Sequence, residues 1–205
     1  MTRLSRDFYL GDTVEIAKKL LGCCIVRKLG DEWLLCRITE TEAYVGRMDK
    51  ACHTYGGRRT PRTEVMFGEA GHAYIYFTYG MHHCLNFVTE PKGEASAVLI
   101  RGLEPLLGLD TMSRNRFGKP FAEQSTYQRK NFLNGPGKVT QALALTREQN
   151  GLDLTVCDEL FVTDSPAGFG VSAEKAEFTI CAGKRIGIDY AEEAVDFPWR
   201  FWIKR

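Results

Sequence analysis

The sequence lacks the long apolar runs and the paired cysteines that are typical of membrane proteins and of disulfide-rich secreted proteins. It has no run of 18 apolar residues, and its first twelve residues, MTRLSRDFYLGD, contain no apolar core of a signal peptide. Its seven cysteines are an odd number, and none of them form a Cys-x-x-Cys pair. Reduced thiols fit this pattern better than a disulfide framework. We therefore expect a soluble intracellular protein.

Internal repeats, low-complexity tracts and a linker that would divide the chain are also missing. The apolar fraction of 44% and the charged fraction of 26% are ordinary for globular proteins, so composition names no function. A chain of 205 residues is long enough to bury a self-sufficient core. Residues 1–205 are therefore expected to form one domain.

The whole chain has almost no excess of charge, with a formal net charge of +1, but two of its segments have a clear excess of one sign. Between Arg114 and Glu148 there are seven Lys and Arg residues and two acids, whereas the residues from Gln149 to Pro198 include ten acids and three bases. Such a split can present one basic face to a polyanion, and it can equally reflect the solvated faces of two subregions. The charge pattern permits a nucleic-acid partner without establishing one.

Short strand-like segments separated by turns dominate the chain. Asp12 followed by Glu15 predicts a capped helix that runs to about Leu21. A long loop over 46–72 is expected to contain a helical turn around Met48–Cys52. The other expected elements are strands at 23–29 and 32–42, two strands around a turn at 79–80, a strand at 97–102, helices over 104–116 and from 134–138 onward, and strands at 184–188 and 199–203. Strands without regular crossover helices predict an α+β class with a largely antiparallel sheet.

Two carboxylates end the second expected strand. Strand alternation places Glu40 and Glu42 on the same face as the apolar residues at 34, 36 and 38. Burial and mutual repulsion there would raise the pKa of a carboxyl group, and a nearby arginine would oppose them. A carboxylate held in this way can accept a proton from an attacking water. The pair can also be a structural one that is neutralised by Arg37 or Arg101.

Four flat side chains lie close to these acids in the sequence. Tyr44 follows Glu42 with the same strand parity, Tyr74 and Tyr76 share one face of their own strand, and His53 lies in the loop between them. Aromatic faces can enclose a planar heterocycle and recognise it by shape and stacking. Tyrosines on strands are also ordinary core residues. Their convergence on one acid favours a pocket.

A turn places one further aromatic residue away from any core. Tyr79 lies beside Gly80 at the turn of a hairpin and is followed by Met81. An exposed aromatic or apolar tip is typical of a wedge between stacked bases, although a turn aromatic can also fold back on its own hairpin.

Two segments have residues that can contact phosphate. The stretch 56–62 includes Arg58 and Thr60 on a glycine-rich backbone, and NGPGK at 134–138 offers free amides at a helix start together with Lys138. For zinc, the available side chains are those of Cys52-His53 and His82-His83-Cys84. Adjacent ligands on a strand point to opposite faces and the usual short Cys/His spacings are absent, so the sequence does not favour a metal site.

Taken together and in this order, the motifs resemble the alkyladenine (3-methyladenine) DNA glycosylase family. The resemblance spans nearly the whole chain and is carried by ITETEAY (38–44), ACHTYGGRRTPR (51–62), YIYFTYGMHHCLN (74–86), AVLIRGLEP (97–105), NGPGK and QAL (134–143), and RIGID and PWRFW (185–202). It implies a single compact domain with a curved, mostly antiparallel sheet, surrounding helices and a protruding β-hairpin. It also implies a monofunctional hydrolase of base-excision repair, which flips alkylated or deaminated purines out of duplex DNA and cleaves the N-glycosidic bond with a water activated by a glutamate.

The resemblance also assigns roles to residues of this chain. Glu42 would be the general base, and Arg101 would help to hold the water and the carboxylate. The pocket for the flipped base would consist of Tyr44, His53, Tyr76 and Asn86, with Asn86 disfavouring normal guanine. Intercalation and backbone contacts would involve Tyr79, Met81, Arg58, Thr60, Met66 and Lys138. One departure is visible, because His82 and His83 stand where aromatic residues are expected in vertebrate relatives.

The expected partner is therefore double-stranded DNA that contains damaged purines, bound by a monomer without a cofactor and without contact with a membrane. The protein would be cytoplasmic and nucleoid-associated in a bacterium, or nuclear in a eukaryote. A non-catalytic nucleic-acid-binding domain of the same fold would use the same basic and aromatic surface, and a zinc-dependent hydrolase is a third alternative. The sequence does not rank 3-methyladenine, 7-methylguanine, hypoxanthine and ethenoadenine as lesions.

Overall fold

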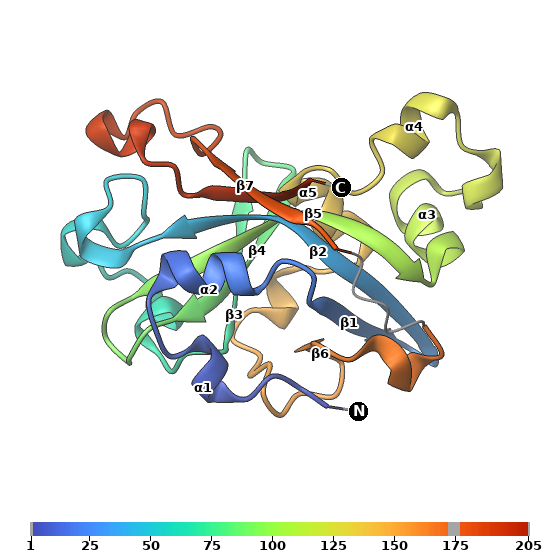
Figure 1. Cartoon of the computed structure of the whole chain (residues 1–205), viewed down its shortest axis with the longest axis horizontal. Helices are drawn as coiled ribbons and strands as arrows, with labels where there is room; N and C mark the ends of the chain where they lie inside the picture. The colour runs from blue at the N-terminus through green and yellow to red at the C-terminus, as the bar shows by residue number, and fades with distance from the viewer. Residues whose placement is uncertain (1, 172–176, 205) are drawn as a thin grey trace.

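The computed structural model describes residues 2–171 and 177–204, and its centre is an antiparallel sheet of eight strands (Figure 1). The strands are β1 (Cys24–Leu29), β2 (Glu32–Tyr44), β3 (Ala73–Thr78), β4 (His82–Thr89), β5 (Ser96–Leu107), β6 (Leu160–Thr163), β7 (Thr179–Gly183) and β8 (Arg200–Lys204). Six of them follow the order β3-β4-β5-β2-β1-β6, and β8 pairs with both β2 and β7. One edge of β2 pairs with β5, while the other edge pairs first with β1 and then with β8.

Short helices surround this sheet (Figure 1). The α-helices are α1 (Arg6–Tyr9), α2 (Thr13–Lys19), α3 (Leu109–Phe117), α4 (Thr126–Lys130) and α5 (Pro136–Ala142). Single 3₁₀ turns are η1 (Gly46–Met48), η2 (Tyr55–Gly57), η3 (Glu64–Phe67), η4 (Phe121–Glu123), η5 (Arg147–Gln149), η6 (Pro166–Phe169) and η7 (Glu192–Asp196). The predicted cap is confirmed, because the Asp12 side chain accepts a hydrogen bond from the Glu15 amide. The predicted helix start at NGPGK is confirmed as well, with Pro136 in the first turn of α5.

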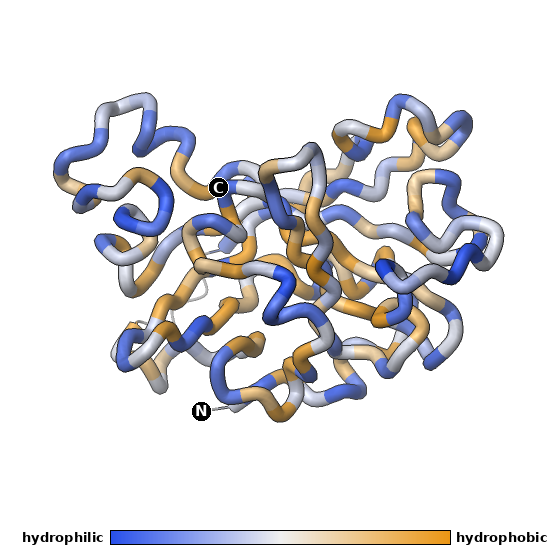
Figure 2. Tube along the Cα trace, turned by 180° about the vertical axis from the view of Figure 1, so that it is seen from behind, coloured by the Kyte–Doolittle hydropathy of each residue, from blue (hydrophilic) through white to orange (hydrophobic). Residues whose placement is uncertain are grey.

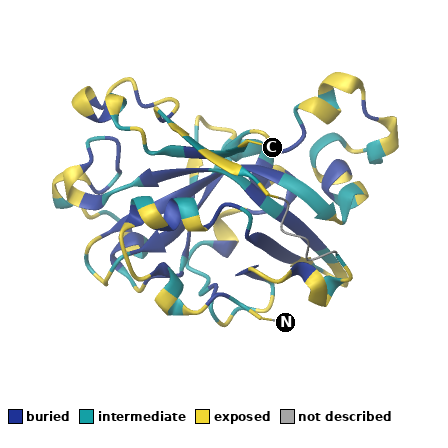
Figure 3. Cartoon of the chain, viewed as in Figure 1, coloured by how far each residue is buried: buried dark blue, intermediate teal, exposed yellow. Residues whose placement is uncertain are grey.

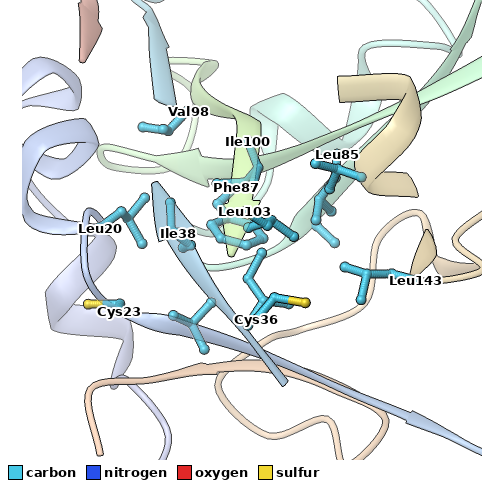
Figure 4. Close-up of a cluster of buried hydrophobic side chains, with 14 of the residues drawn as sticks. Leu20, Cys23, Cys36, Ile38, Leu85, Phe87, Val98, Ile100, Leu103 and Leu143 are labelled. Atoms are coloured by element: carbon cyan, nitrogen blue, oxygen red, sulfur yellow. The ribbon is translucent and has the colours of Figure 1, made fainter. Parts of the chain in front are cut away.

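The main core lies between one face of the sheet and the helices that cover it. Leu20 after α2, Ile38 on β2, Phe87 on β4, Ile100 on β5 and Leu143 after α5 meet in this cluster (Figure 4). The middle of the strands is accordingly buried while helix surfaces and loops are exposed (Figure 3), and hydrophilic residues concentrate in the outer loops (Figure 2). Burial of these apolar side chains, at about 25 cal/mol per Å², is the main force that stabilises the domain.

These features confirm the predicted fold class, which is a single compact α+β domain with a curved antiparallel sheet and few helices. The predicted hairpin of β3 and β4 is present, with its turn at Tyr79-Gly80. Its protrusion toward a partner stays a prediction. Within the described ranges no helix is long and apolar enough to cross a membrane.

A β-bulge in β2 overturns one prediction, namely that the two acids share a face with the apolar residues before them. The register between β2 and β5 shifts between Ile38 and Thr41. Ile38 packs in the main core, and beyond the shift it is Thr41 and Ala43 that turn to that core, with the Thr41 hydroxyl bonded to an α2 carbonyl at 2.8 Å. The two opposite register shifts on either side of Glu40 reverse the alternation of β2, so Glu40 and Glu42 lie on the opposite face.

Three element boundaries also differ from prediction. β5 continues to Leu107, so the helix expected from 104 begins at Leu109. The helical turn expected at Met48–Cys52 occurs earlier, at Gly46–Met48. Residues 184–188 form no strand, because Gly187 has a φ of 76° and Arg185 is buried in an ion pair. The strand expected at 199–203 is confirmed as β8.

Candidate active site

A cavity of about 450 Å³ opens on the face of the sheet that carries the two acids. Its walls come from β2, β3, β4 and β5, from the loop after β2, and from residues 186–190. The loop after β2 and the segment before β8 lie side by side at one end of the sheet (Figure 1), where Lys50 bridges Glu192 and Glu193. Segments far apart in the sequence thus enclose one hollow.

Glu42 is fully buried beside this cavity, with no exposed side-chain surface. Its Oε1 accepts the backbone N–H of Ile186 at 2.9 Å and lies 3.5 Å from Nε of Arg101, while its Oε2 accepts the Tyr44 hydroxyl at 2.8 Å. Burial raises the pKa of Glu42, and Arg101, the Ile186 amide and Tyr44 counteract part of that rise. The site therefore holds a carboxylate with an increased affinity for a proton.

Glu40 has a different environment, although it lies only two residues away. Its side chain is 20% exposed, and its Oε1 accepts from Arg101 Nε at 3.2 Å and from Arg200 Nη1 at 3.1 Å. Arg37 instead pairs with Glu104 at 2.7 Å. Arg101 thus bridges both acids, and Glu40 has the character of a structural ion pair.

Three aromatic rings line the cavity next to one another. The His53 ring meets Tyr76 edge-on at 4.7 Å between centroids, and Tyr74 and Tyr76 are tilted by 35° at 5.4 Å. Tyr44 lines the same cavity from β2. The structure therefore brings together the aromatic residues that the sequence placed near one acid, and it leaves open space beside them.

Tyr74 anchors His53, a contact that sequence parity did not reveal. The Tyr74 hydroxyl lies 3.0 Å from His53 Nδ1, and Nη2 of Arg62 lies 3.5 Å from its Nε2. A guanidinium only donates, so Nε2 accepts and Nδ1 carries the proton that is donated to Tyr74. Burial lowers the pKa of His53 to about 4, with further lowering by Arg62 and Arg58. His53 is therefore neutral at ordinary pH.

Asn86 lines the cavity from β4 and is only 4% exposed. Its amide nitrogen donates to the Tyr74 carbonyl at 3.1 Å and to the Cys84 carbonyl at 3.4 Å. A side chain that is held by two backbone carbonyls cannot easily move aside. It therefore gives this part of the cavity a fixed shape.

The hairpin between β3 and β4 presents an exposed tip. Tyr79 is 80% exposed and Met81 is 66% exposed. Tyr79 has a φ of 51°, in the left-handed region that glycine favours, and Gly80 follows with 66°. A bulky aromatic residue in this conformation at the surface is unusual.

The residues predicted to contact the DNA backbone lie in three different environments in the structure. Arg58 and Thr60 line a second, smaller hollow of about 290 Å³ next to the first. Met66 is only 2% exposed and forms part of the cavity wall. The Lys138 ammonium bonds to Asn134 Oδ1 at 2.7 Å, and partial burial together with Arg116 lowers its pKa. Glu174 and Lys175, which count in the charge asymmetry, lie outside the described residues.

The histidines that depart from the vertebrate pattern do not line the cavity. The His82 ring lies against Gly137, where an added Cβ would come within 2.9 Å of it. The His83 ring packs on Phe77 with centroids 5.0 Å apart. In the part of the chain that the structure describes, no three His, Cys, Asp or Glu side chains form a group that could hold a metal ion.

Sequence reasoning missed three residues of the site. Arg185, Ile186 and Tyr190 come from a segment that alternation predicted to be partly a strand, yet Ile186 and Tyr190 line the cavity. Arg185 lies behind them, 4.8 Å from the Tyr44 ring. The glycine at 187 within an apolar run was the signal available in the sequence.

Comparisons with known proteins agree with this geometry. The family model described as Methylpurine-DNA glycosylase matches residues 7–205. A relative from Clostridium perfringens (strain 13) is 50% identical over 98% of this chain and 96% of its own, and one from Clostridium novyi is 50% identical over 100% and 96%. A third, from Clostridium acetobutylicum, is 46% identical over 98% and 94%. All three bear the name "Putative 3-methyladenine DNA glycosylase".

The comparisons give the class of protein, which is a DNA glycosylase. The chain belongs to the methylpurine-DNA glycosylase family. DNA is accordingly its substrate partner, and repair of alkylated bases is its field of activity.

Proposed function

We propose that the protein is a monofunctional glycosylase that flips alkylated or deaminated purines out of duplex DNA and hydrolyses the N-glycosidic bond with a water activated by Glu42. The observation that carries this proposal is Glu42 itself, which is fully buried and has a raised pKa. It lies behind the wall of the aromatic cavity and contacts three residues that line it, Tyr44, Arg101 and Ile186. A buried acid of this kind is matched to accepting a proton.

The proposed step is a displacement at the sugar. A carboxylate oxygen of Glu42 takes a proton from water, the water oxygen bonds to C1′, and the bond between C1′ and the purine nitrogen breaks with its electron pair leaving on the purine. Alkylation at N3 or N7 makes the ring cationic, so the purine leaves as a neutral molecule. A neutral lesion such as hypoxanthine requires an added proton from the protein or from water. Arg101, 3.5 Å from Glu42 Oε1, would hold the carboxylate and the water.

The cavity supports recognition of the flipped base by shape. Tyr44 would stack on one face, with His53 and Tyr76 on the other. Electron-rich tyrosine faces favour a cationic ring by about 0.5–2 kcal/mol. Asn86, held on two carbonyls, would crowd the position of a guanine 2-amino group and disfavour normal guanine.

The exposed residues around the cavity would contact the duplex. Tyr79 at the hairpin tip would fill the gap left by the flipped nucleotide, with Met81 beside it. Arg58 and Thr60 would contact phosphates. Among the described residues that line the cavity there is no lysine, which supports water rather than an amine as the nucleophile. We propose that the protein acts as a monomer.

The test is single-turnover release of purines from methylated duplex DNA by the wild type, by Glu42→Gln and by the matched control Glu40→Gln. General-base catalysis contributes about 10²–10⁴-fold, so Glu42→Gln should lose that much rate while its affinity for lesion DNA is kept. Glu40→Gln should retain most of its activity because Glu40 lies in a partly exposed ion pair. Equal rates for the wild type and Glu42→Gln would overturn the assignment of the base.

A further inference from the structure

We propose that the buried ion pair between Arg185 and Asp49 is a positioning device that ties the two walls of the cavity to each other and to Glu42. This inference rests on the proposed function, because it concerns how the catalytic acid and the base-binding wall are held. Neither residue is proposed to touch the DNA. Both would act through the backbone and the side chains that they fix.

The geometry of the pair is that of a fork on a carboxylate. Nη1 of Arg185 bonds to Oδ2 of Asp49 and Nη2 bonds to Oδ1 at 2.8 Å, and neither side chain has exposed surface. Such bidentate pairs fix orientation as well as charge. Removing one partner of a buried pair leaves an uncompensated charge, so both segments that carry the pair depend on it.

On one side, Asp49 organises the loop that follows β2. Its Oδ2 accepts the Val45 amide at 3.1 Å and its Oδ1 accepts the Ala51 amide at 3.0 Å. These bonds fix the chain between Tyr44, which ends β2, and His53, two residues after Ala51. The position of the His53 wall relative to Tyr44 therefore depends on Asp49.

On the other side, Arg185 organises the segment before β8. Its Nη1 donates to the Ala43 carbonyl at 2.8 Å and its Nη2 donates to the Ala194 carbonyl at 3.2 Å. The Ala43 bond ties the segment to β2 directly between Glu42 and Tyr44. The next residue, Ile186, then delivers its N–H to Glu42 Oε1 at 2.9 Å.

The guanidinium also supports the ring that is proposed to stack on the flipped base. It lies 4.8 Å from the centroid of Tyr44 and 5.1 Å from that of Trp199. Tyr44 in turn donates its hydroxyl to Glu42 at 2.8 Å. One buried cation thus contacts the ring of Tyr44 and, through Ile186, places a donor on the acid.

The experiment compares Arg185→Lys and Asp49→Asn with the wild type and with the control Arg27→Lys. Arg27 lies on β1, away from the cavity, and is a buried arginine that is 4% exposed. It pairs with Glu159 at 3.4 Å. The measurements are affinity for lesion DNA, the single-turnover release rate from pH 4 to 9, and backbone hydrogen exchange of residues 45–53 and 184–194.

We expect Arg185→Lys to lower the release rate by about 10–100-fold, the usual range for groups that orient a reacting residue, with a smaller change in affinity. The acidic limb of its pH profile should move to higher pH. The charged and titratable groups that face Glu42 are Arg101 on β5, Tyr44 and Glu40 on β2, Cys84 on β4 and Arg185 itself. Lysine at 185 keeps the positive charge and the other four groups are unchanged, so the shift would report the loss of the Ile186 donor. Hydrogen exchange should accelerate in both segments together, and the control should change none of these readouts.

A wild-type rate and pH limb in folded Arg185→Lys and Asp49→Asn would overturn the proposal, as would faster exchange in only one of the two segments. If neither variant folds, hydrogen exchange of the native wild type in low denaturant tests the proposal instead. The proposal requires residues 45–53 and 184–194 to open as one unit, and separate opening of the two segments would overturn it. If the wild type releases no base, the proposed function fails, and the exchange data still decide whether the pair positions the two walls.

Discussion

At the scale of the residue, Tyr79 breaks a local backbone rule at the exposed tip of a hairpin. A left-handed backbone costs a non-glycine residue roughly 1–2 kcal/mol, yet Tyr79 has a φ of 51° and exposes 80% of its surface. Its ring gains little from burial in the free protein. The most direct account is that the ring is used when the protein is bound to DNA.

We therefore expect Tyr79→Gly to keep the free energy of unfolding close to that of the wild type, because relief of the left-handed strain offsets the flexibility that glycine adds to the unfolded chain. The free energy of binding to lesion DNA should become less favourable by about 1–3 kcal/mol, the range for loss of one base-stacking ring. Thermal unfolding and titration of a lesion duplex measure the two effects. Tyr79→Phe should resemble the wild type in both, and normal binding by the glycine variant would remove the wedge assignment.

Local strand parity was informative about the cavity lining. The parity of Tyr74 with Tyr76 placed both rings on one face, and both line the cavity together with Tyr44. The bond between Tyr74 and His53 joins a strand to a loop, and no spacing encodes it. The ion pair of Arg185 with Asp49 spans 136 residues and was equally invisible.

At the scale of the element, the bulge in β2 decides on which face Glu42, the proposed general base, lies. Opposite the bulge is Gly102 on β5, where an added Cβ would lie 2.9 Å from Cβ of Glu40 and 3.1 Å from Oγ1 of Thr39. Only glycine leaves room for β2 at this irregular pair. The bulge, and with it the position of Glu42, depends on this glycine.

Gly102→Ala should therefore shift β2 at the bulge. We expect a loss of stability of about 1–3 kcal/mol, typical of overpacking, and a fall in the single-turnover rate that approaches 100-fold, because misplacement by about 1 Å has that effect. Denaturant unfolding and base release measure both. Gly11→Ala is the control, since its Cβ would meet only Ile16 at 3.9 Å; an active, stable Gly102→Ala protein would show that the bulge tolerates a methyl group there.

Element types were predicted more reliably than their geometry. Alternation and turn residues identified β1 to β4, and the cap at Asp12 marked α2. Alternation cannot reveal a bulge, because the extra residue shows only when the partner strand is known. The end of β5 was misplaced because Pro105 falls within the strand, where proline usually marks an end.

At the scale of the whole molecule, the burial of Glu42 lowers the free energy of unfolding at neutral pH. Burial raises the pKa of Glu42 above its ordinary 4.5 in the folded protein. The folded state therefore holds a proton that the unfolded state releases. Stability falls as the pH rises from about 4.5 through the folded pKa of this group.

It follows that Glu42→Gln, which has no proton to release, should gain in melting temperature relative to the wild type as the pH rises from 4 to 7. Thermal unfolding of both proteins across this range measures the difference, and the other titrating groups largely cancel in the comparison. If the melting temperature of Glu42→Gln instead falls relative to that of the wild type toward neutral pH, the polar partners of Glu42 favour its ionised form more than burial disfavours it.

The α+β class and the family were predictable from the sequence because motifs along nearly the whole chain point to the same fold. The part of the cavity wall that comes from residues 186–190 was not predictable, since that segment meets the strands only in the folded protein. Glu42 contacts both β2, through Tyr44, and the segment before β8, through Ile186. The proposed function depends on Glu42 acting as an ionised base.

The measurement that tests this most directly is the pH dependence of single-turnover purine release from methylated duplex DNA, for the wild type and Glu42→Gln. The wild-type rate should rise with pH to a plateau, with a midpoint above 4.5, and Glu42→Gln should be slower by about 10²–10⁴-fold and lack that limb. His53 titrates at about 4 and would remain in both profiles. The same limb in Glu42→Gln, or an undiminished plateau, would contradict the role of Glu42 as the base.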